Sequence, residues 1–234
     1  MAVPVVLVHG LRTSSTMWRP QVDALRSAGH EVTAVDLPGH GCRVDEEFTL
    51  DGAVETVAEA VHGSGGRALV VGLSLGGYTA IAHAARHPEQ VAGLVAAGCS
   101  TRPTSVVLRG WEVLARGIGL LPDRGAWLNQ ALVDVTLPAD GASDVGAGGF
   151  ALDVTVPVLR AMRAARPLDD LAQVQVPVWV VNGRYDHFRT QERRFVSACA
   201  DGHLVVIPHA THLVSVLAPV AFTRVLLEAA AQVA

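Results

Sequence analysis

The chain has 234 residues, of which 50% are hydrophobic and 17% are charged. This length suits one α/β domain with a buried core, and the composition excludes a disordered chain. The net charge is -4 and the 18 Lys and Arg residues form no basic run, which argues against nucleic acid or an anionic membrane surface as a partner. The first residues show no signal-peptide pattern and no apolar run reaches bilayer length, so we expect a cytoplasmic protein without a membrane span.

The first hundred residues alternate apolar runs, which predict buried strands, with helical patterns. The expected strands cover residues 3–8, 31–35, 69–73 and 91–97, and helices are expected around residues 18–28, 54–62 and 75–87. Glycine or proline separates most of these segments. The strict alternation indicates βαβ units, and therefore a parallel sheet with right-handed crossovers.

The alternation is interrupted between Ser100 and about Gln173, where no strand-like run of comparable quality occurs. Apolar spacing predicts helices near residues 107–118, 127–133 and 158–165, and the glycine-rich interval 138–149 is expected to be flexible. We interpret this insertion as a helical lid above the sheet. The alternation then resumes with strands at 177–183 and 203–207 and helices at 191–200 and 219–232.

Chemically capable residues lie just beyond the carboxyl ends of several predicted strands. His9 and Gly10 follow the first strand, Ser74 the third, Asp186 the fifth and His212 the last. In open parallel sheets this carboxyl edge is where active sites lie. Ser74 also stands between Gly72 and Gly76 at a strand-to-helix turn, where small neighbours allow a strained serine to project its hydroxyl.

These motifs resemble those of the α/β-hydrolase-fold serine hydrolases, over nearly the whole chain apart from the insertion. The motifs that carry the resemblance are His9-Gly10, residues 36–41, residues 72–77, residues 182–186 and the segment from Pro208 through His212 to Pro219. The resemblance implies a single α/β-hydrolase domain, with its core at 1–99 and 174–234 and a helical lid at about 100–173. Its sheet is expected to be a shortened, mostly parallel one of about six strands, because the chain has no room for the two strands that commonly precede the first one.

By the same resemblance Ser74 is the nucleophile, His212 the general base and Asp186 the carboxylate that orients it. The backbone N–H groups of Leu11 and Leu75 are the expected oxyanion donors. His209 competes with His212, which is favoured because the family's catalytic histidine precedes a proline by seven residues, as His212 precedes Pro219. Thr211 replaces the family's usual glycine, and the usual acidic residue near that proline is absent. The structural alternatives are that Ser74 is an ordinary turn serine and that Asp186 is a loop carboxylate that caps the next helix.

Several other residues are open to structural and functional interpretations. His9 is expected to shape the oxyanion loop rather than to transfer protons, and His187 is expected at the surface or in a pocket wall. Three residues of the insertion either pack helices or line an acyl pocket: Trp111, Trp127 and Met162. Three arginines are expected to be solvated, with contact to a substrate carboxylate as the alternative: Arg102, Arg109 and Arg124. Asp36 and His40 lie in a turn that the family uses for packing.

The sequence therefore predicts a carboxylesterase-like serine hydrolase that needs no cofactor and no metal. Its expected substrate is a small to medium hydrophobic carboxylic ester, or a thioester, cleaved through an acyl-enzyme intermediate. The three cysteines, Cys42, Cys99 and Cys199, lack CxxC spacing, and no HExxH motif occurs. The alternatives are C–C bond hydrolysis, acyl transfer or elimination or cyclisation by the same triad, and a non-catalytic ligand-binding protein.

Overall fold

The computed structural model describes residues 2–234 and is built around a six-stranded sheet. The strands lie in the order β2-β1-β3-β4-β5-β6 and every neighbouring pair is parallel. Their bounds are β1 Val5–Val8, β2 Val32–Val35, β3 Ala68–Leu73, β4 Val91–Ala97, β5 Val178–Gly183 and β6 Gly202–Ile207. The predicted parallel sheet of about six strands is confirmed.

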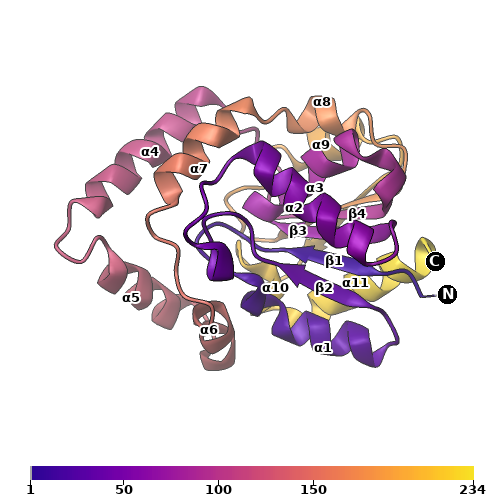
Figure 1. Cartoon of the computed structure of the whole chain (residues 1–234), viewed down its shortest axis with the longest axis horizontal. Helices are drawn as coiled ribbons and strands as arrows, with labels where there is room; N and C mark the ends of the chain where they lie inside the picture. Colours follow the sequence, from indigo (N-terminus) through magenta and orange to yellow (C-terminus); the bar gives the residue numbers. More distant parts are fainter. Residues whose placement is uncertain (1) are drawn as a thin grey trace.

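Helices cover both faces of the sheet (Figure 1). One face carries α1 (Arg19–Ser27) and α11 (Pro219–Gln232), with the short α10 (Val214–Leu217) beside them. The other face carries α2 (Leu50–Gly63), α3 (Leu75–Arg86), α8 (Pro167–Leu171) and α9 (Glu192–Ala198). Short 3₁₀ turns at Ser15–Trp18, Gly41–Arg43 and Pro88–Gln90 complete the connections. The short helices α8 and α10 were not predicted from the sequence.

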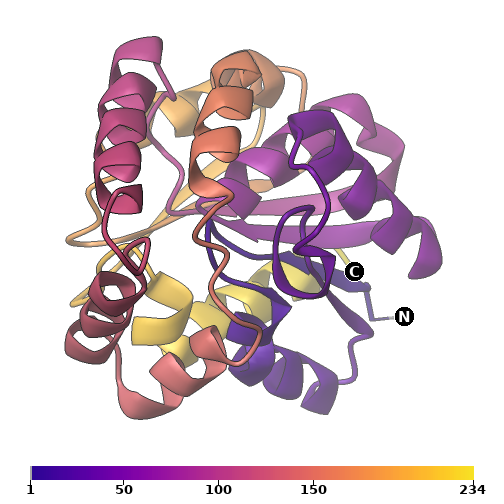
Figure 2. The same ribbon diagram turned by 60° about the vertical axis from the view of Figure 1, so that its left-hand side comes forward.

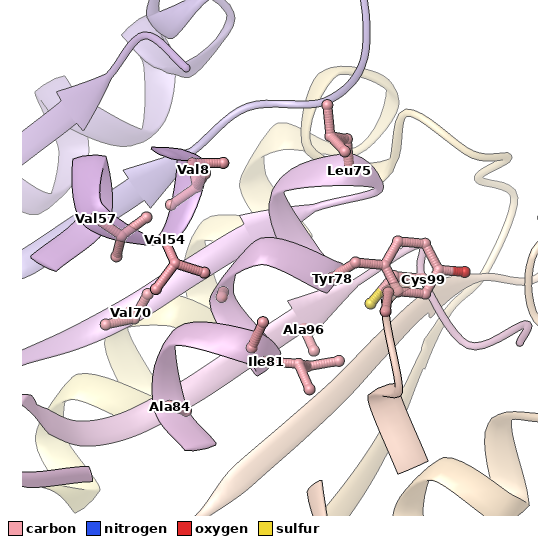
Figure 3. Packing of buried hydrophobic residues seen from close by; sticks show 14 of the residues in the cluster. Val8, Val54, Val57, Val70, Leu75, Tyr78, Ile81, Ala84, Ala96 and Cys99 are labelled. Atoms are coloured by element: carbon pink, nitrogen blue, oxygen red, sulfur yellow. The ribbon is translucent and has the colours of Figure 1, made fainter. Parts of the chain in front are cut away.

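Alternate residues of each strand supply the two halves of the core. In β1, Val6 and Val8 face α2 and α3, whereas Val5 and Leu7 face α1 and α11. Because both faces are covered, the strands read as unbroken apolar runs rather than as alternating patterns. Figure 3 shows the first half of the core, where Val54 of α2 and Ile81 of α3 pack over the strands. Burial of each such side chain contributes about 1.5 to 3 kcal/mol.

The insertion between β4 and α8 consists of helices, as expected (Figure 2). They are α4 (Ser105–Gly119), α5 (Ala126–Thr136), α6 (Ala139–Gly146) and α7 (Thr155–Ala161), followed by a 3₁₀ turn at Met162–Ala164. In Figure 1, α4, α5 and α6 lie at the side of the molecule opposite the C-terminus. No helix among residues 2–234 combines the length and apolarity that crossing a bilayer requires.

The expectation of a flexible interval at 138–149 was wrong, because most of it forms α6. Tertiary contacts override the weak helical propensity of its glycines. Val145 is buried, and the Asp144 carbonyl accepts a hydrogen bond of 2.7 Å from the Thr16 hydroxyl. The Asp144 carboxylate also pairs with Arg19 at 3.2 Å. The helix is therefore anchored to the loop that follows β1.

A buried carboxylate links the helices of the insertion. The Glu112 side chain on α4 is only 5% exposed and pairs with Arg116 at 2.6 Å and Arg160 at 3.0 Å, and also with Arg163. The hydrogen bond from Arg160 and the three positive charges lower the Glu112 pKa, against the opposing effect of burial. Since Arg160 lies on α7 and Arg163 follows it, this cluster joins α4 to α7.

Candidate active site

Ser74 occupies the sharp turn between β3 and α3. Its backbone has φ 56° and ψ −114°, an unfavourable conformation for a residue with a side chain. A Cβ added at Gly72 would lie 2.1 Å from the Gly76 carbonyl oxygen, and one added at Gly76 would lie 2.2 Å from that of Val8. Only glycine fits at either position. The close approach of α3 to β1 and β3 thus holds Ser74 in place while its side chain stays partly accessible.

Asp186 and His212 reach the same point from the ends of β5 and β6. The loop after β5 is held against the loop after β6 by backbone hydrogen bonds, including Tyr185 N–H to the Ala210 carbonyl at 2.9 Å. His212 Nδ1 lies 3.1 Å from Asp186 Oδ1, and its Nε2 lies 2.9 Å from Ser74 Oγ. The structure therefore places these three side chains in one continuous hydrogen-bonded chain.

The Asp186 side chain is fully buried but remains suited to carry a negative charge. Burial alone would raise its pKa, yet the hydrogen bond and charge of His212 and the Phe188 backbone N–H lower it overall. That N–H donates to Oδ1 at 2.8 Å. An ionised Asp186 keeps His212 protonated on Nδ1, which leaves Nε2 free to accept the Ser74 proton.

Gly98, directly after β4, is a site position that the sequence analysis did not identify. A Cβ added there would lie 3.2 Å from His212 Nδ1 and 3.3 Å from Asp186 Oδ2. Its φ of +59° also disfavours any other residue. Its place after a predicted strand, like that of Ser74, Asp186 and His212, was the available signal.

The backbone N–H groups of Leu11 and Leu75 are available to bind an anion. Within residues 2–234 neither donates to a protein acceptor, and Leu75 begins helix α3, whose N-terminus carries partial positive charge. Gly10 brings the first loop against the serine, since a Cβ there would lie 3.6 Å from Ser74 Cβ. Both N–H groups thus belong to the segments that flank Ser74.

His9 stabilises this loop through two contacts with backbone groups. Its Nε2 accepts the Leu37 N–H at 3.0 Å, which leaves Nδ1 to donate to the Gly10 carbonyl at 2.7 Å. Full burial, with a smaller effect of the neighbouring His40, lowers the His9 pKa to about 4. A neutral imidazole with both nitrogens engaged in backbone contacts fits the predicted role in shaping the loop.

The rings of His187 and Phe188 lie beside that of His212. The Phe188 ring centroid lies 4.8 Å from that of His212, and the His187 centroid lies 5.2 Å from it. Trp111 of α4 lies 6.3 Å from His187 and 6.2 Å from Phe188. Trp111 thus brings the insertion next to the hydrogen-bonded chain. Phe188 had no signal in the sequence, because it stands in an irregular loop.

The other two residues considered for an acyl pocket lie elsewhere. Trp127 is 74% exposed on α5, so the structure supports neither packing nor pocket lining for it. No residue of α5 is fully buried, although Val133 on this helix packs against the core at its edge. Met162 is 4% exposed within the core cluster and therefore packs helices.

A cavity of about 740 Å³ lies between the insertion and the loop after β1. Its apolar walls come mainly from α4, the turn after it and residues 152–156, and its charged lining residues are Arg12, Arg116, Arg124 and Asp153. Arg124 pairs with Asp153 at 2.8 Å, whereas the exposed Arg102 and Arg109 do not line this cavity. Ser74 and His212 are not among its lining residues, but Arg12 directly follows Leu11.

The remaining sequence candidates lie outside the hydrogen-bonded chain. His209 is exposed with φ 58°, so it does not compete with His212 for Ser74. Asp36 accepts the backbone N–H groups of Ser15 and Cys42, at 2.6 and 2.9 Å, which fits a structural role in its turn. Among residues 2–234, no three His, Cys, Asp or Glu side chains gather where they could hold a metal ion.

Comparison with known proteins identifies the family to which the chain belongs. The model of the alpha/beta hydrolase family matches residues 5–225. The chain belongs to the alpha/beta hydrolase family. Among curated relatives, it is 38% identical to the probable esterase PIR7A of Oryza sativa over 95 residues, which is 38% of this chain and 36% of that protein. The chain thus aligns with about a third of that relative's length.

A second relative aligns along nearly the whole chain. The putative carbamate hydrolase RutD of Variovorax paradoxus is 28% identical over 98% of this chain and 92% of that protein. A solved esterase from Thermogutta terrifontis superimposes with a TM-score of 0.81, at 22% identity over 99% of this chain and 90% of that one. The fold is thus that of the alpha/beta hydrolases.

Proposed function

We propose that this alpha/beta hydrolase is a serine esterase that cleaves a carboxylic ester of a small to medium, largely hydrophobic substrate through an acyl-enzyme. The observation that carries the proposal is the unbroken chain from Asp186 through His212 to Ser74, with contacts of 3.1 and 2.9 Å. A serine hydroxyl is a poor nucleophile at neutral pH unless a positioned base removes its proton. The strained backbone of Ser74 and the aromatic surroundings of His212 support the same reaction.

The proposed reaction has two halves. Ser74 Oγ attacks the ester carbonyl carbon while its proton passes to His212 Nε2, and the carbonyl oxygen becomes an oxyanion bound by the Leu11 and Leu75 N–H groups. The C–O bond to the alcohol then breaks, and the alcohol leaves with the proton from His212. Water attacks the acyl-enzyme in the same manner, giving its proton to His212, and the carboxylic acid is released with restoration of Ser74.

Labelling by a fluorophosphonate probe tests the proposal. The probe phosphonylates serines that an adjacent base activates, so intact-mass analysis should show one adduct, located on the peptide that contains Ser74. Ser74→Ala should abolish the adduct, whereas the exposed Ser105→Ala should retain it. A folded wild-type protein that takes no label would contradict the esterase and would favour a ligand-binding role for the same pocket.

A further inference from the structure

Arg12 lines the large cavity and, within residues 2–234, has no acidic partner. Arg116 pairs with Glu112 and Arg124 pairs with Asp153, whereas Arg12 forms no ion pair with any residue of the 2–234 range. The Arg12 guanidinium is nevertheless partly buried, and burial lowers its pKa from the ordinary value. A partly desolvated positive charge without a counter-ion is costly unless a ligand supplies one.

The structure holds Arg12 in a defined position. Its Nε donates to the Thr155 hydroxyl at 3.2 Å, and its carbonyl accepts the Ala151 N–H at 3.2 Å. The backbone φ of 67° is unfavourable for a residue with a side chain. Within residues 2–234, its Nη1 and Nη2 atoms have no hydrogen-bond partner. Two parallel donors held in this way match the two oxygens of a carboxylate.

The cavity is lined by residues of two segments that also contribute to the candidate site. Arg12 directly follows Leu11, whose N–H is one of the proposed oxyanion donors. On α4, Trp111 lies next to the rings of His187 and Phe188. Arg116, which lines the cavity, lies about 7.5 Å farther along the axis of the same helix. The lining between the charged groups is apolar, and includes Val113, Leu152 and Val156. Arg12 is thus the lining residue that adjoins the proposed oxyanion loop, and the wall beside it is apolar.

We propose that Arg12 binds a carboxylate of the substrate, so that the preferred substrate is an ester carrying a carboxylate a few carbon atoms from the scissile bond. This inference rests on the proposed esterase function and specifies its substrate class. Arg12 acts as a specificity residue, with Thr155 holding its side chain. Arg12 lies outside the insertion, whose arginines are the ones for which the sequence predicts contact with a substrate carboxylate as an alternative.

The test compares charged and neutral esters of matched chain length. Monomethyl glutarate is compared with methyl pentanoate for a carboxylate on the acyl side, and 4-acetoxybutyrate with butyl acetate for one on the alcohol side. Released acid is titrated at constant pH. In the wild type, kcat/KM for the charged ester of at least one pair should exceed that for its neutral partner by about tenfold or more, mainly through KM. Equal or lower values in both pairs would overturn the inference.

Variants of Arg12 distinguish loss of carboxylate recognition from a general loss of activity. Arg12→Met should reduce the charged-to-neutral ratio of kcat/KM at least about tenfold, and Arg12→Lys should retain part of it, since lysine keeps the charge but loses the paired donors. Arg109→Met, on an exposed residue outside the cavity, should leave the ratio unchanged. A purely structural Arg12 would lower both rates together and leave the ratio constant, which would also overturn the inference.

The same samples distinguish this failure from failure of the esterase proposal. Fluorophosphonate labelling of Ser74 reports on the nucleophile and does not depend on a carboxylate. Labelled wild-type protein without a charged-ester preference would contradict only the role of Arg12. Protein that neither labels nor hydrolyses any of the four esters would contradict the proposed function, and the inference with it.

Discussion

The carboxyl edge of the sheet and the helical insertion differ in how closely their residues pack. At the edge, strands that are buried on both faces end at residues whose positions depend on backbone contacts of a few ångströms, as at Gly72 and Gly76. The insertion exposes apolar side chains, including Val106 at 82% and Trp127 at 74%, and a charged cluster around Glu112 joins two of its helices. The packing at the edge thus fixes the geometry of its side chains. The insertion packs less closely, so its conformation can vary and is suited to substrate selection.

The largest expected effect is at the edge itself. Ser74→Ala should lower ester turnover about 10³-fold or more, because it removes the proposed nucleophile. His212→Ala should have a comparable effect, whereas His209→Ala, three residues earlier and exposed, should retain most activity. Steady-state kinetics on p-nitrophenyl esters measures all three. A His212→Ala enzyme with a normal rate would show that the base is another residue.

Paired glycine substitutions test the contrast in packing. Gly72→Ala would place a Cβ 2.1 Å from the Gly76 carbonyl oxygen, so the free energy of unfolding should fall by about 3 kcal/mol or more. Gly117→Ala on α4 meets nothing within 4 Å and should stabilise the helix by about 0.5 to 1 kcal/mol. Chemical denaturation gives both values. Similar losses for the two variants would remove the proposed difference between the regions.

His9 should make the edge sensitive to acid. Its folded-state pKa of about 4 lies below the ordinary 6.5, so between these values the unfolded chain binds a proton that the folded chain does not. Stability therefore falls as the pH decreases, by about 2 kcal/mol between pH 7 and pH 5 from this residue. Unfolding measured at both pH values should show a loss smaller by that amount in His9→Gln. The exposed His209→Gln serves as control, and an unchanged pH dependence in His9→Gln would refute the assignment.

The smallest effect is expected in the insertion. Glu112→Gln removes the charge shared by Arg116, Arg160 and Arg163, so α4 and α7 should separate more often. Limited proteolysis with thermolysin should cut the variant faster within residues 100–173. Glu46→Gln, which breaks an exposed pair with Arg43 outside the insertion, should leave the cleavage rate unchanged. Faster cleavage outside the insertion instead would contradict the linking role of Glu112.

The sequence could predict the sheet and the positions of Ser74, Asp186 and His212, because strand periodicity and turn glycines are local signals and parallel strands bring their carboxyl ends together. It could not predict α6, which depends on contacts of Val145 and Asp144 with distant residues. Trp127 was uncertain for the same reason, since only tertiary packing decides which face of a helix is covered. The proposed role of Arg12 could not be predicted because it depends on Arg12 having no acidic partner within residues 2–234, which becomes visible only once the other charges are placed.

The most direct test of the central claim is to trap the acyl-enzyme. Wild-type protein mixed with p-nitrophenyl butyrate and quenched in acid within the first turnovers should carry a butyryl group on the peptide containing Ser74, as determined by mass spectrometry. The Ser74→Ala protein should carry none. Steady hydrolysis without any acyl group on Ser74, or with the group on another residue, would contradict the account.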